Sequence, residues 1–141
     1  MKNKLILILL SLCCLSVSAQ KKKSKKPKLA DFTITQTKTL KKTGTQLFLK
    51  KVISDARCPE GTDCIWPGEA QANISVYKKG KWNDEQILTF SPKTQDENKQ
   101  WIAEQLSIPI EKIKSVTLFP YPKNEVKINP KSYVIKVAIN P

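Results

Sequence analysis

Apolar and polar residues alternate along much of the chain after Asp31, which is the pattern of strands that bury one face. Two segments, 70–77 and 133–139, show this alternation most clearly, and both are rich in β-branched and aromatic residues. Their apolar positions are Ala70, Ala72, Ile74, Val76, Tyr133, Ile135, Val137 and Ile139. Each segment therefore predicts a strand with one side in a hydrophobic core.

Four further segments have the composition of strands. We expect a short strand to begin at Phe32, a long one at Thr45, and two more at 86–90 and 114–119. The long segment is expected to place its apolar residues on two faces, with Leu47, Leu49 and Ile53 on one and Phe48 and Val52 on the other. Glycine-containing or polar turns are expected at 42–44, 79–81 and 123–124.

One segment departs from this period. Residues 94–97 resemble a capping box, in which the Thr94 hydroxyl would cap a helix, and Glu97 stands three residues later. The side chains Trp101, Ile102, Gln105 and Leu106 then share one helical face. This pattern predicts a short amphipathic helix over residues 95–106, ended by 107–110, with Trp101 packed on the sheet.

The predicted fold is mostly β: a small antiparallel β-sandwich or partly open barrel with one short helix at about residues 95–106. Several of the expected strands carry apolar side chains on both faces, which favours a layered arrangement. Residues 31–141 are long enough to form a single β domain with a real core.

Residues 1–19 have the pattern of a signal peptide. Lys2 and Lys4 precede an apolar run over 5–15, and small residues before Gln20 suit cleavage. The run is shorter than the roughly 18 to 20 residues that span a bilayer, so no transmembrane span is expected after its removal. The protein is predicted to be exported, either to a periplasm or into the medium. Lipid attachment at Cys13 or Cys14 is the alternative, although Leu12 is larger than lipoprotein processing usually accepts.

A lysine-rich tail, predicted to be disordered, covers residues 20–30. The chain has 25 basic and 12 acidic residues, with a formal net charge of +13. Its tail lysines are Lys21, Lys22, Lys23, Lys25, Lys26 and Lys28. Such a run stays solvated and either serves as a spacer or is attracted to an anionic surface, such as lipid headgroups or acidic polysaccharide. Nucleic acid is the less favoured partner, because the rest of the chain has no arginine-rich stripe with interleaved aromatics.

Cys58 and Cys64 are the only cysteines that remain once residues 1–19 are removed, so an oxidising compartment would pair them. The ring of seven residues corresponds to about 2.4 kcal/mol in the chain-entropy estimate, which favours a bridge that shapes a loop. A redox pair would normally be spaced C-x-x-C at a helix start, and here Pro59 follows the first cysteine of a C-x5-C spacing. Two thiolates in a chain without histidine are too few ligands for a zinc site.

The cysteines belong to a longer motif. The sequence reads Ser-Asp-Ala-Arg-Cys-Pro over 54–59 and Cys-Ile-Trp-Pro-Gly-Glu-Ala over 64–70. This resembles the signature S-D-S-R-C-P, four residues, C-x-W-A-G-x-A, found in small exported or lipid-anchored bacterial proteins of uncharacterised function. The segments 118–122 and 133–137 are similar to the closing pattern of that group.

The resemblance implies a compact β domain outside the cytoplasm and no particular activity. The chain departs from the group at Ala56, at Pro67 and in the insertion that contains the predicted helix.

The loop around the two cysteines is the candidate binding site. Its candidate contact residues are Arg57, Pro59, Glu60, Asp63 and Trp66. A stiff loop loses little entropy on binding, and a protease inhibitor could present 59–63 in this way.

Other roles for the same residues remain open. Arg57 would pair with Asp55 or Asp63, and Trp66 would fill the end of the sandwich. Calcium binding by Asp55, Glu60 and Asp63 is a further alternative, although their spacing matches no EF-hand loop.

No catalytic residues, cofactor or metal are predicted. The chain contains no histidine to activate a nucleophile, and its carboxylates show no spacing that singles out a catalytic pair. The favoured hypothesis is a non-catalytic extracytoplasmic binding module that uses the disulfide-closed loop to contact a protein or a cell-envelope polymer. The alternative is a structural envelope-associated protein held to an anionic surface by its lysine-rich tail.

Overall fold

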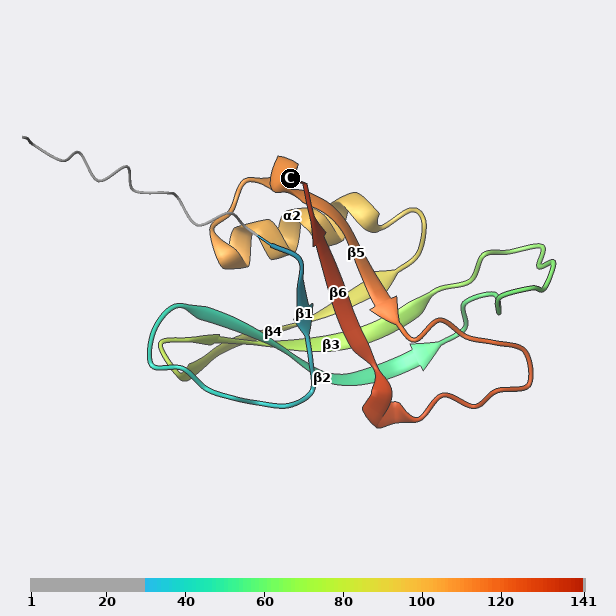
Figure 1. Ribbon diagram of the computed structural model, residues 1–141, viewed down its shortest axis with the longest axis horizontal. Helices are drawn as coiled ribbons and strands as arrows, with labels where there is room; N and C mark the ends of the chain where they lie inside the picture. Colours follow the sequence, from blue (N-terminus) through green and yellow to red (C-terminus); the bar gives the residue numbers. More distant parts are fainter. Residues whose placement is uncertain (1–29, 141) are drawn as a thin grey trace, which may run out of the picture.

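The computed structural model describes residues 30–140, which form six strands and one α-helix (Figure 1). In chain order the elements are β1 (Phe32–Ile34), β2 (Thr45–Asp55), β3 (Ala70–Lys78), β4 (Lys81–Phe90), α2 (Gln95–Leu106), β5 (Ile113–Phe119) and β6 (Val134–Ile139). Short 3-10 turns, Ile110–Lys112 and Pro130–Ser132, precede β5 and β6. The predicted signal peptide, with Cys13 and Cys14, and the six tail lysines lie outside the described residues.

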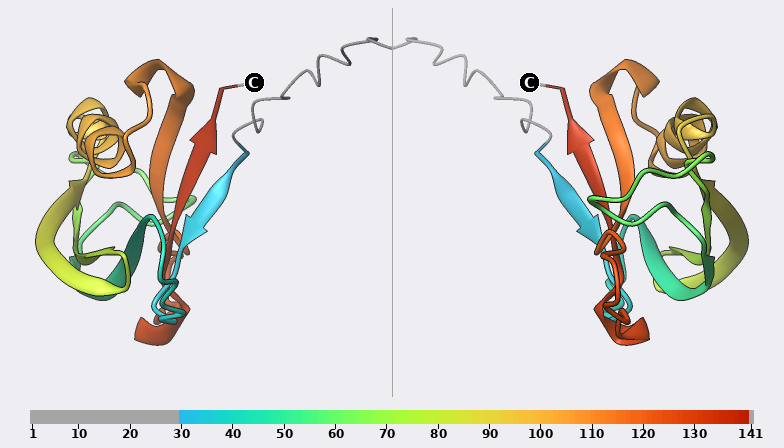
Figure 2. Two further views of the ribbon diagram at one scale, coloured as in Figure 1. Left: turned by 90° about the vertical axis from the view of Figure 1, so that its left-hand side faces the viewer. Right: turned by 90° about the vertical axis from the view of Figure 1, so that its right-hand side faces the viewer.

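Two three-stranded antiparallel sheets make up the domain. One has the strand order β1-β6-β5 and the other β2-β3-β4. Figure 2 shows the sheets as two layers, with α2 at the edge formed by β4 and β5. The prediction of a mostly β, sandwich-like fold with one short helix is confirmed, since the described residues form two separate sheets and no closed barrel.

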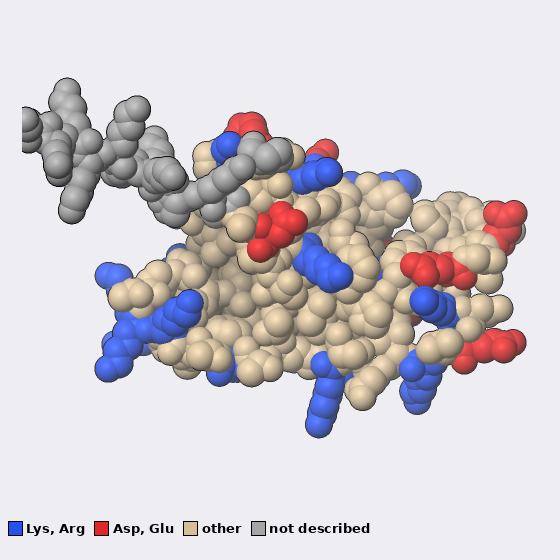
Figure 3. All heavy atoms as spheres, viewed as in Figure 1, with Lys and Arg blue, Asp and Glu red and all other residues tan. Residues whose placement is uncertain are grey.

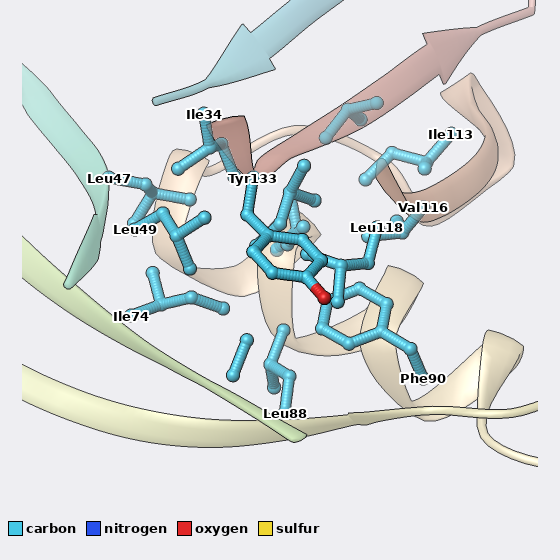
Figure 4. Close-up of a cluster of buried hydrophobic side chains, with 14 of the residues drawn as sticks. Ile34, Leu47, Leu49, Ile74, Leu88, Phe90, Ile113, Val116, Leu118 and Tyr133 are labelled. Carbon is cyan, nitrogen blue, oxygen red and sulfur yellow. The ribbon is translucent and has the colours of Figure 1, made fainter. Parts of the chain in front are cut away.

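The core lies between the two layers. It receives the alternating side chains of β3 and β6 that the sequence pattern predicted, together with residues of every other strand and of α2. Its largest fully buried side chains are Leu49, Ile74, Val76, Ile102, Val116, Leu118, Ile135 and Val137. Figure 4 shows the ring of Tyr133 lying among core side chains from both sheets.

Helix α2 has the predicted bounds and is joined to both sheets by side-chain amides. Gln95 Nε2 donates to the backbone oxygen of Val116 on β5 at 3.0 Å, and Asn98 Nδ2 donates to that of Thr89 on β4 at 2.8 Å. Trp101 is half-buried against the core, as predicted. Within residues 30–140, no helix is both long and apolar enough to cross a membrane.

The predicted capping box was wrong. The Thr94 side chain makes no capping hydrogen bond to α2. Its hydroxyl oxygen instead accepts from the Ser91 N–H at 3.1 Å, and the hydroxyl donates to the backbone oxygen of Thr89 near the end of β4. The end of the helix is as expected, with Ser107 in the left-handed conformation at the C-cap.

The face predicted for Ile53 was also wrong. The pairing of β2 with β3 shifts between Leu49 and Lys51 and again between Val52 and Ser54. A bulge of this kind reverses the alternation that follows it, so Val52 packs against the core and Ile53 is 45% exposed. Strand β4 begins at Lys81 and is therefore longer than the predicted 86–90. The prediction missed its first half because those residues are exposed and show no alternation of apolar and polar side chains.

Candidate functional site

Residues 56–69, which we call the disulfide loop, extend the hairpin of β2 and β3 beyond the sheet. The Ala56 N–H donates to the Glu69 oxygen and the Cys58 N–H to the Pro67 oxygen, each at 2.9 Å. Beyond these bonds a disulfide joins Cys58 to Cys64, with 6.0 Å between their Cα atoms. The predicted pairing is confirmed, and the bridge closes the tip of a loop whose stem is already hydrogen-bonded.

Gly68 allows the two sides of the stem to approach each other. Its φ of +65° lies in the left-handed region, and a Cβ atom there would overlap the backbone carbonyl of Ala56. Gly61, at the tip, has a φ of +80° with nothing within 4 Å of a built Cβ. Both glycines therefore need a left-handed backbone, but only at Gly68 would a Cβ atom overlap a neighbouring group.

This difference gives a matched test of the stem. Gly61→Ala should cost about 1 kcal/mol of unfolding free energy, the price of a left-handed alanine. Gly68→Ala should cost clearly more, because the stem must also move apart to relieve the overlap with Ala56. Urea unfolding of both variants measures the difference, and equal losses would contradict the close packing of the stem.

Arg57 fixes the disulfide loop to the opposite sheet. Its side chain is buried, with the residue only 7% exposed, and its Nε and NH2 groups donate to the two carboxylate oxygens of Asp55 at 2.8 and 2.6 Å. The remaining donors bind backbone oxygens, NH1 that of Leu118 at 2.6 Å and NH2 that of Pro120 at 2.9 Å. The guanidinium also lies 4.7 Å from the centre of the Tyr121 ring.

Of the interpretations open for Arg57, the structure shows the ion pair with Asp55, in a bidentate form. Asp63 does not take part in it. Arg57 therefore positions the loop from inside, and its side chain presents little surface to a partner. The second anchor of Asp55 is Tyr133, whose hydroxyl donates to it at 2.9 Å. The sequence pattern placed Tyr133 in the core but gave no signal for this bond.

The network shifts the pKa values of both acids. Burial alone would raise the pKa of Asp55, but hydrogen bonds from Arg57 and Tyr133 together outweigh it, so the pKa lies below its ordinary value. Burial, followed by the hydrogen bond to Asp55, raises the pKa of Tyr133 to about 12.

These shifts predict how stability depends on pH. The folded pKa of Asp55 is depressed, so its contribution is present above the ordinary value of 3.8 and is lost as the pH falls through the folded pKa. The folded pKa of Tyr133 is raised, so its contribution is present below pH 10 and is lost as the pH rises from 10 to about 12. Urea unfolding at pH values from about 9 to about 12 measures this loss of unfolding free energy. The loss should be clear in the wild type and smaller in Tyr133→Phe. An unchanged slope in Tyr133→Phe would contradict the network.

A second set of contacts holds the tip. The Glu60 N–H donates to the Pro122 oxygen at 2.9 Å, which joins the loop to the connection between β5 and β6. Within the tip, the oxygen of half-buried Pro59 accepts from the N–H and hydroxyl of Thr62 at 3.2 and 2.6 Å. Figure 1 shows both connections at the same end of the molecule. The disulfide-closed ring is thus a turn that is fixed to the connection between β5 and β6.

Two large apolar side chains project from this end. Ile65 is 93% exposed and Trp66 is 77% exposed. The interpretation that Trp66 fills the end of the sandwich was wrong, because Trp66 lies beyond the hydrogen-bonded stem, where it is exposed to solvent. Ile65 was missed as a candidate, although an isoleucine between a cysteine and a tryptophan in an otherwise polar loop was a usable signal.

The acidic residues of the loop are spread over its surface. Glu60, Asp63 and Glu69 are exposed, and Asp55 is engaged by Arg57. Among residues 30–140, no three side chains of the metal-binding types come together as a possible metal site. A calcium site formed by Asp55, Glu60 and Asp63 therefore has no basis in the geometry.

A small apolar cleft lies beside the loop stem. It has a volume of about 180 Å³ and is lined by residues that include Arg57, Pro67, Phe90, Leu118 and Tyr121. Pockets for drug-sized molecules usually measure about 300–1,000 Å³. This cleft is thus too small for such a ligand.

Comparison with protein-family models, curated proteins and solved structures found no match to this chain. The resemblance to exported bacterial β-domain proteins stays a prediction.

Proposed function

We propose that this protein is a non-catalytic extracytoplasmic binding module that contacts a partner protein through the tip of its disulfide loop. The observation that supports this most strongly is the exposure of Ile65 and Trp66 on a loop fixed by Arg57 and by a disulfide. A disulfide is stable in the oxidising compartments to which the predicted signal peptide would lead.

The exposed pair has the chemistry of a binding hot spot. Tryptophan is enriched among the few residues that dominate interface energies, and burying a side chain such as Ile65 removes apolar area from water. Because the loop is already held in one conformation, little ordering entropy is lost on binding. The same two residues contribute nothing to the core, so stability gives no reason for their exposure.

The surroundings of the pair favour a protein partner. A fully exposed aliphatic side chain such as Ile65 is best matched by an apolar pocket, which a folded protein offers and a polysaccharide does not. Exposed Glu60 and Asp63 place negative charge at the tip, and Glu69 lies at the base of the stem, where its backbone oxygen accepts from the Ala56 N–H. The complementary surface is therefore an apolar pocket with a basic rim, where the charges would speed association more than they tighten it.

The residues at the disulfide-loop end of the molecule support a role without catalysis. The full chain contains no histidine. The pKa shift of Asp55 is accounted for by its structural partners Arg57 and Tyr133. Both acids of that network are engaged in hydrogen bonds, Asp55 with Arg57 and Tyr133, and Tyr133 with Asp55.

Affinity capture from envelope and culture-fluid fractions, followed by binding measurements on the enriched protein, tests the proposal. Ile65→Ala combined with Trp66→Ala should weaken binding by at least about 30-fold, as expected for a hot spot. Trp82→Ala removes another exposed tryptophan, from β4, and is the matched control that should bind as the wild type. Both variants should keep the wild-type melting temperature, because the side chains are exposed.

The acidic rim gives a second, graded outcome. Glu60→Ala with Asp63→Ala should slow association at low salt and leave dissociation nearly unchanged. Wild-type binding by the Ile65 and Trp66 double variant would reject the proposal. Equal weakening by Trp82→Ala would show that the tip is not the contact surface.

A further inference from the structure

At the opposite end of the molecule, two turns from separate parts of the chain meet. The pairing of Thr45 with Lys78 lies at one end of the β2-β3-β4 sheet, and that of Asp55 with Ala70, next to the disulfide loop, lies at the other. The Lys79 N–H donates to the Gly44 oxygen at 2.9 Å, and a Cβ on Gly80 would lie 3.4 Å from the Lys41 oxygen. The connection 35–44 therefore packs on the turn between β3 and β4.

Side chains hold this connection in place. Gln46 accepts from the Lys41 N–H at 2.8 Å through Oε1 and donates to the Thr39 oxygen at 3.0 Å through Nε2. Lys38 Nζ lies 3.1 Å from the Tyr77 hydroxyl and 5.3 Å from the centre of its ring. The turns thus form a defined surface of the fold.

This surface is strongly basic. Six exposed lysines gather on it, and we call it the basic end: Lys38, Lys41, Lys42, Lys78, Lys79 and Lys81. The segments 35–44 and 77–83 contain no acidic residue. Figure 3 shows lysine side chains projecting at this end with no acidic side chain beside them in this view, whereas the end with the disulfide loop carries both acidic and basic side chains.

Two exposed apolar side chains accompany the lysines. Trp82 is 62% exposed and pairs across the strands with Tyr77. The neighbouring pair, closer to the turn, is Lys78 with Lys81. Leu40 is 48% exposed and directly precedes Lys41. Tryptophan has an apolar body and a polar N–H, and it is enriched where membranes meet water.

We propose that the basic end binds the surface of an anionic lipid bilayer, with its lysines at the headgroups and Trp82 inserted between them. Lysines near such a surface are attracted by its negative potential. Trp82 alone could also stack on a base or a sugar ring. The exposed aliphatic Leu40 beside it favours a lipid surface over an acidic polysaccharide or nucleic acid, because neither offers an apolar layer that takes up both side chains.

This contact is independent of the lysine-rich tail and of the proposed partner site. It uses folded residues only, and it lies at the end opposite the disulfide loop (Figure 1). A molecule attached through the basic end therefore directs Ile65 and Trp66 away from the membrane, where a partner protein can reach them.

Sedimentation of the purified protein with lipid vesicles tests the proposal. The vesicles contain phosphatidylglycerol mixed with phosphatidylcholine, or phosphatidylcholine alone. Replacing Lys41, Lys42 and Lys81 by glutamine should weaken binding to the anionic vesicles about 100-fold, since each of the three lysines near the surface contributes about fivefold. Binding should also fall with added salt.

Two charge-matched variants separate the basic end from net charge and from the tail. One replaces the exposed lysines Lys112, Lys114 and Lys131 by glutamine, and the other replaces Lys21, Lys22 and Lys23. Both should bind clearly better than the basic-end variant. Equal or greater loss in either one, or wild-type binding by the basic-end variant, would overturn the proposal.

Trp82→Ala distinguishes lipid from other anionic partners. It should weaken vesicle binding severalfold while leaving binding to dextran sulfate, a soluble polyanion, unchanged. Unchanged vesicle binding by Trp82→Ala would reject the lipid assignment. Trp66→Ala, at the opposite end, should bind vesicles as the wild type, so this test can fail or succeed independently of the partner-capture experiment.

Discussion

Replacing Arg57 by alanine is expected to lower the free energy of unfolding by about 3–5 kcal/mol, the range for removing one member of a buried ion pair. The substitution leaves the Asp55 carboxylate without its bidentate partner and leaves the backbone oxygens of Leu118 and Pro120 without donors. Each of these groups lost its hydrogen bonds to water on folding, and in the variant no new donor replaces them. The desolvation penalty of each group therefore lowers the stability of the folded state. The loss should appear as a lower midpoint of urea unfolding.

Two further variants show that the geometry, and not only the charge, is responsible. Arg57→Lys keeps a positive charge but cannot supply the planar fork, so it should lose a large part of the same stability. Lys99→Ala breaks an exposed ion pair with Asp96 and should cost less than about 0.5 kcal/mol. A loss of under about 1 kcal/mol for Arg57→Ala, well outside the range for a buried pair, would contradict the role of Arg57 as the anchor.

Removal of the disulfide is expected to cost about 2.4 kcal/mol and to leave the sandwich folded. The bridge closes a small ring at a sequence separation of 6, and the core between the sheets does not include it. Cys58→Ser with Cys64→Ser should therefore unfold cooperatively at a lower urea concentration. Its larger effect should be on partner capture, because the tip that carries Ile65 and Trp66 loses its fixed conformation.

The wild-type protein treated with a reductant is the matched comparison for this double variant. Both should show the same loss of stability and of capture, since both lack only the covalent link. Complete unfolding of the double variant without urea would show that the bridge supports the whole domain, and undiminished capture would show that it does not organise the tip.

The parts of the fold that depend on local patterns were predictable from the sequence. The alternation in β3 and β6 follows from side chains that point to opposite sides of a strand, and α2 from a 3.6-residue period between a threonine and a proline-containing stop. The disulfide followed from counting the cysteines outside the predicted signal peptide. The strands and the helix were predicted from residues close in sequence, and the disulfide from a small number of cysteines.

What could not be predicted depends on distant contacts. The carbonyls that bind Arg57 belong to residues 61 and 63 positions away, and no pattern links them to it. Ile53 changed face because of bulges that the apolar pattern does not reveal. The sequence marked 42–44 and 79–81 as turns, but their meeting at the basic end depends on the pairing of β2 with β3.

The emission of Trp66 tests the central claim most directly, namely that the anchored loop presents this side chain to solvent. Subtracting the fluorescence of Trp66→Phe from that of the wild type isolates it from Trp82 and Trp101. The structure predicts red-shifted emission that acrylamide quenches readily, with anisotropy that falls on reduction of the disulfide. A blue-shifted emission protected from acrylamide would place Trp66 within the sandwich and would contradict the account.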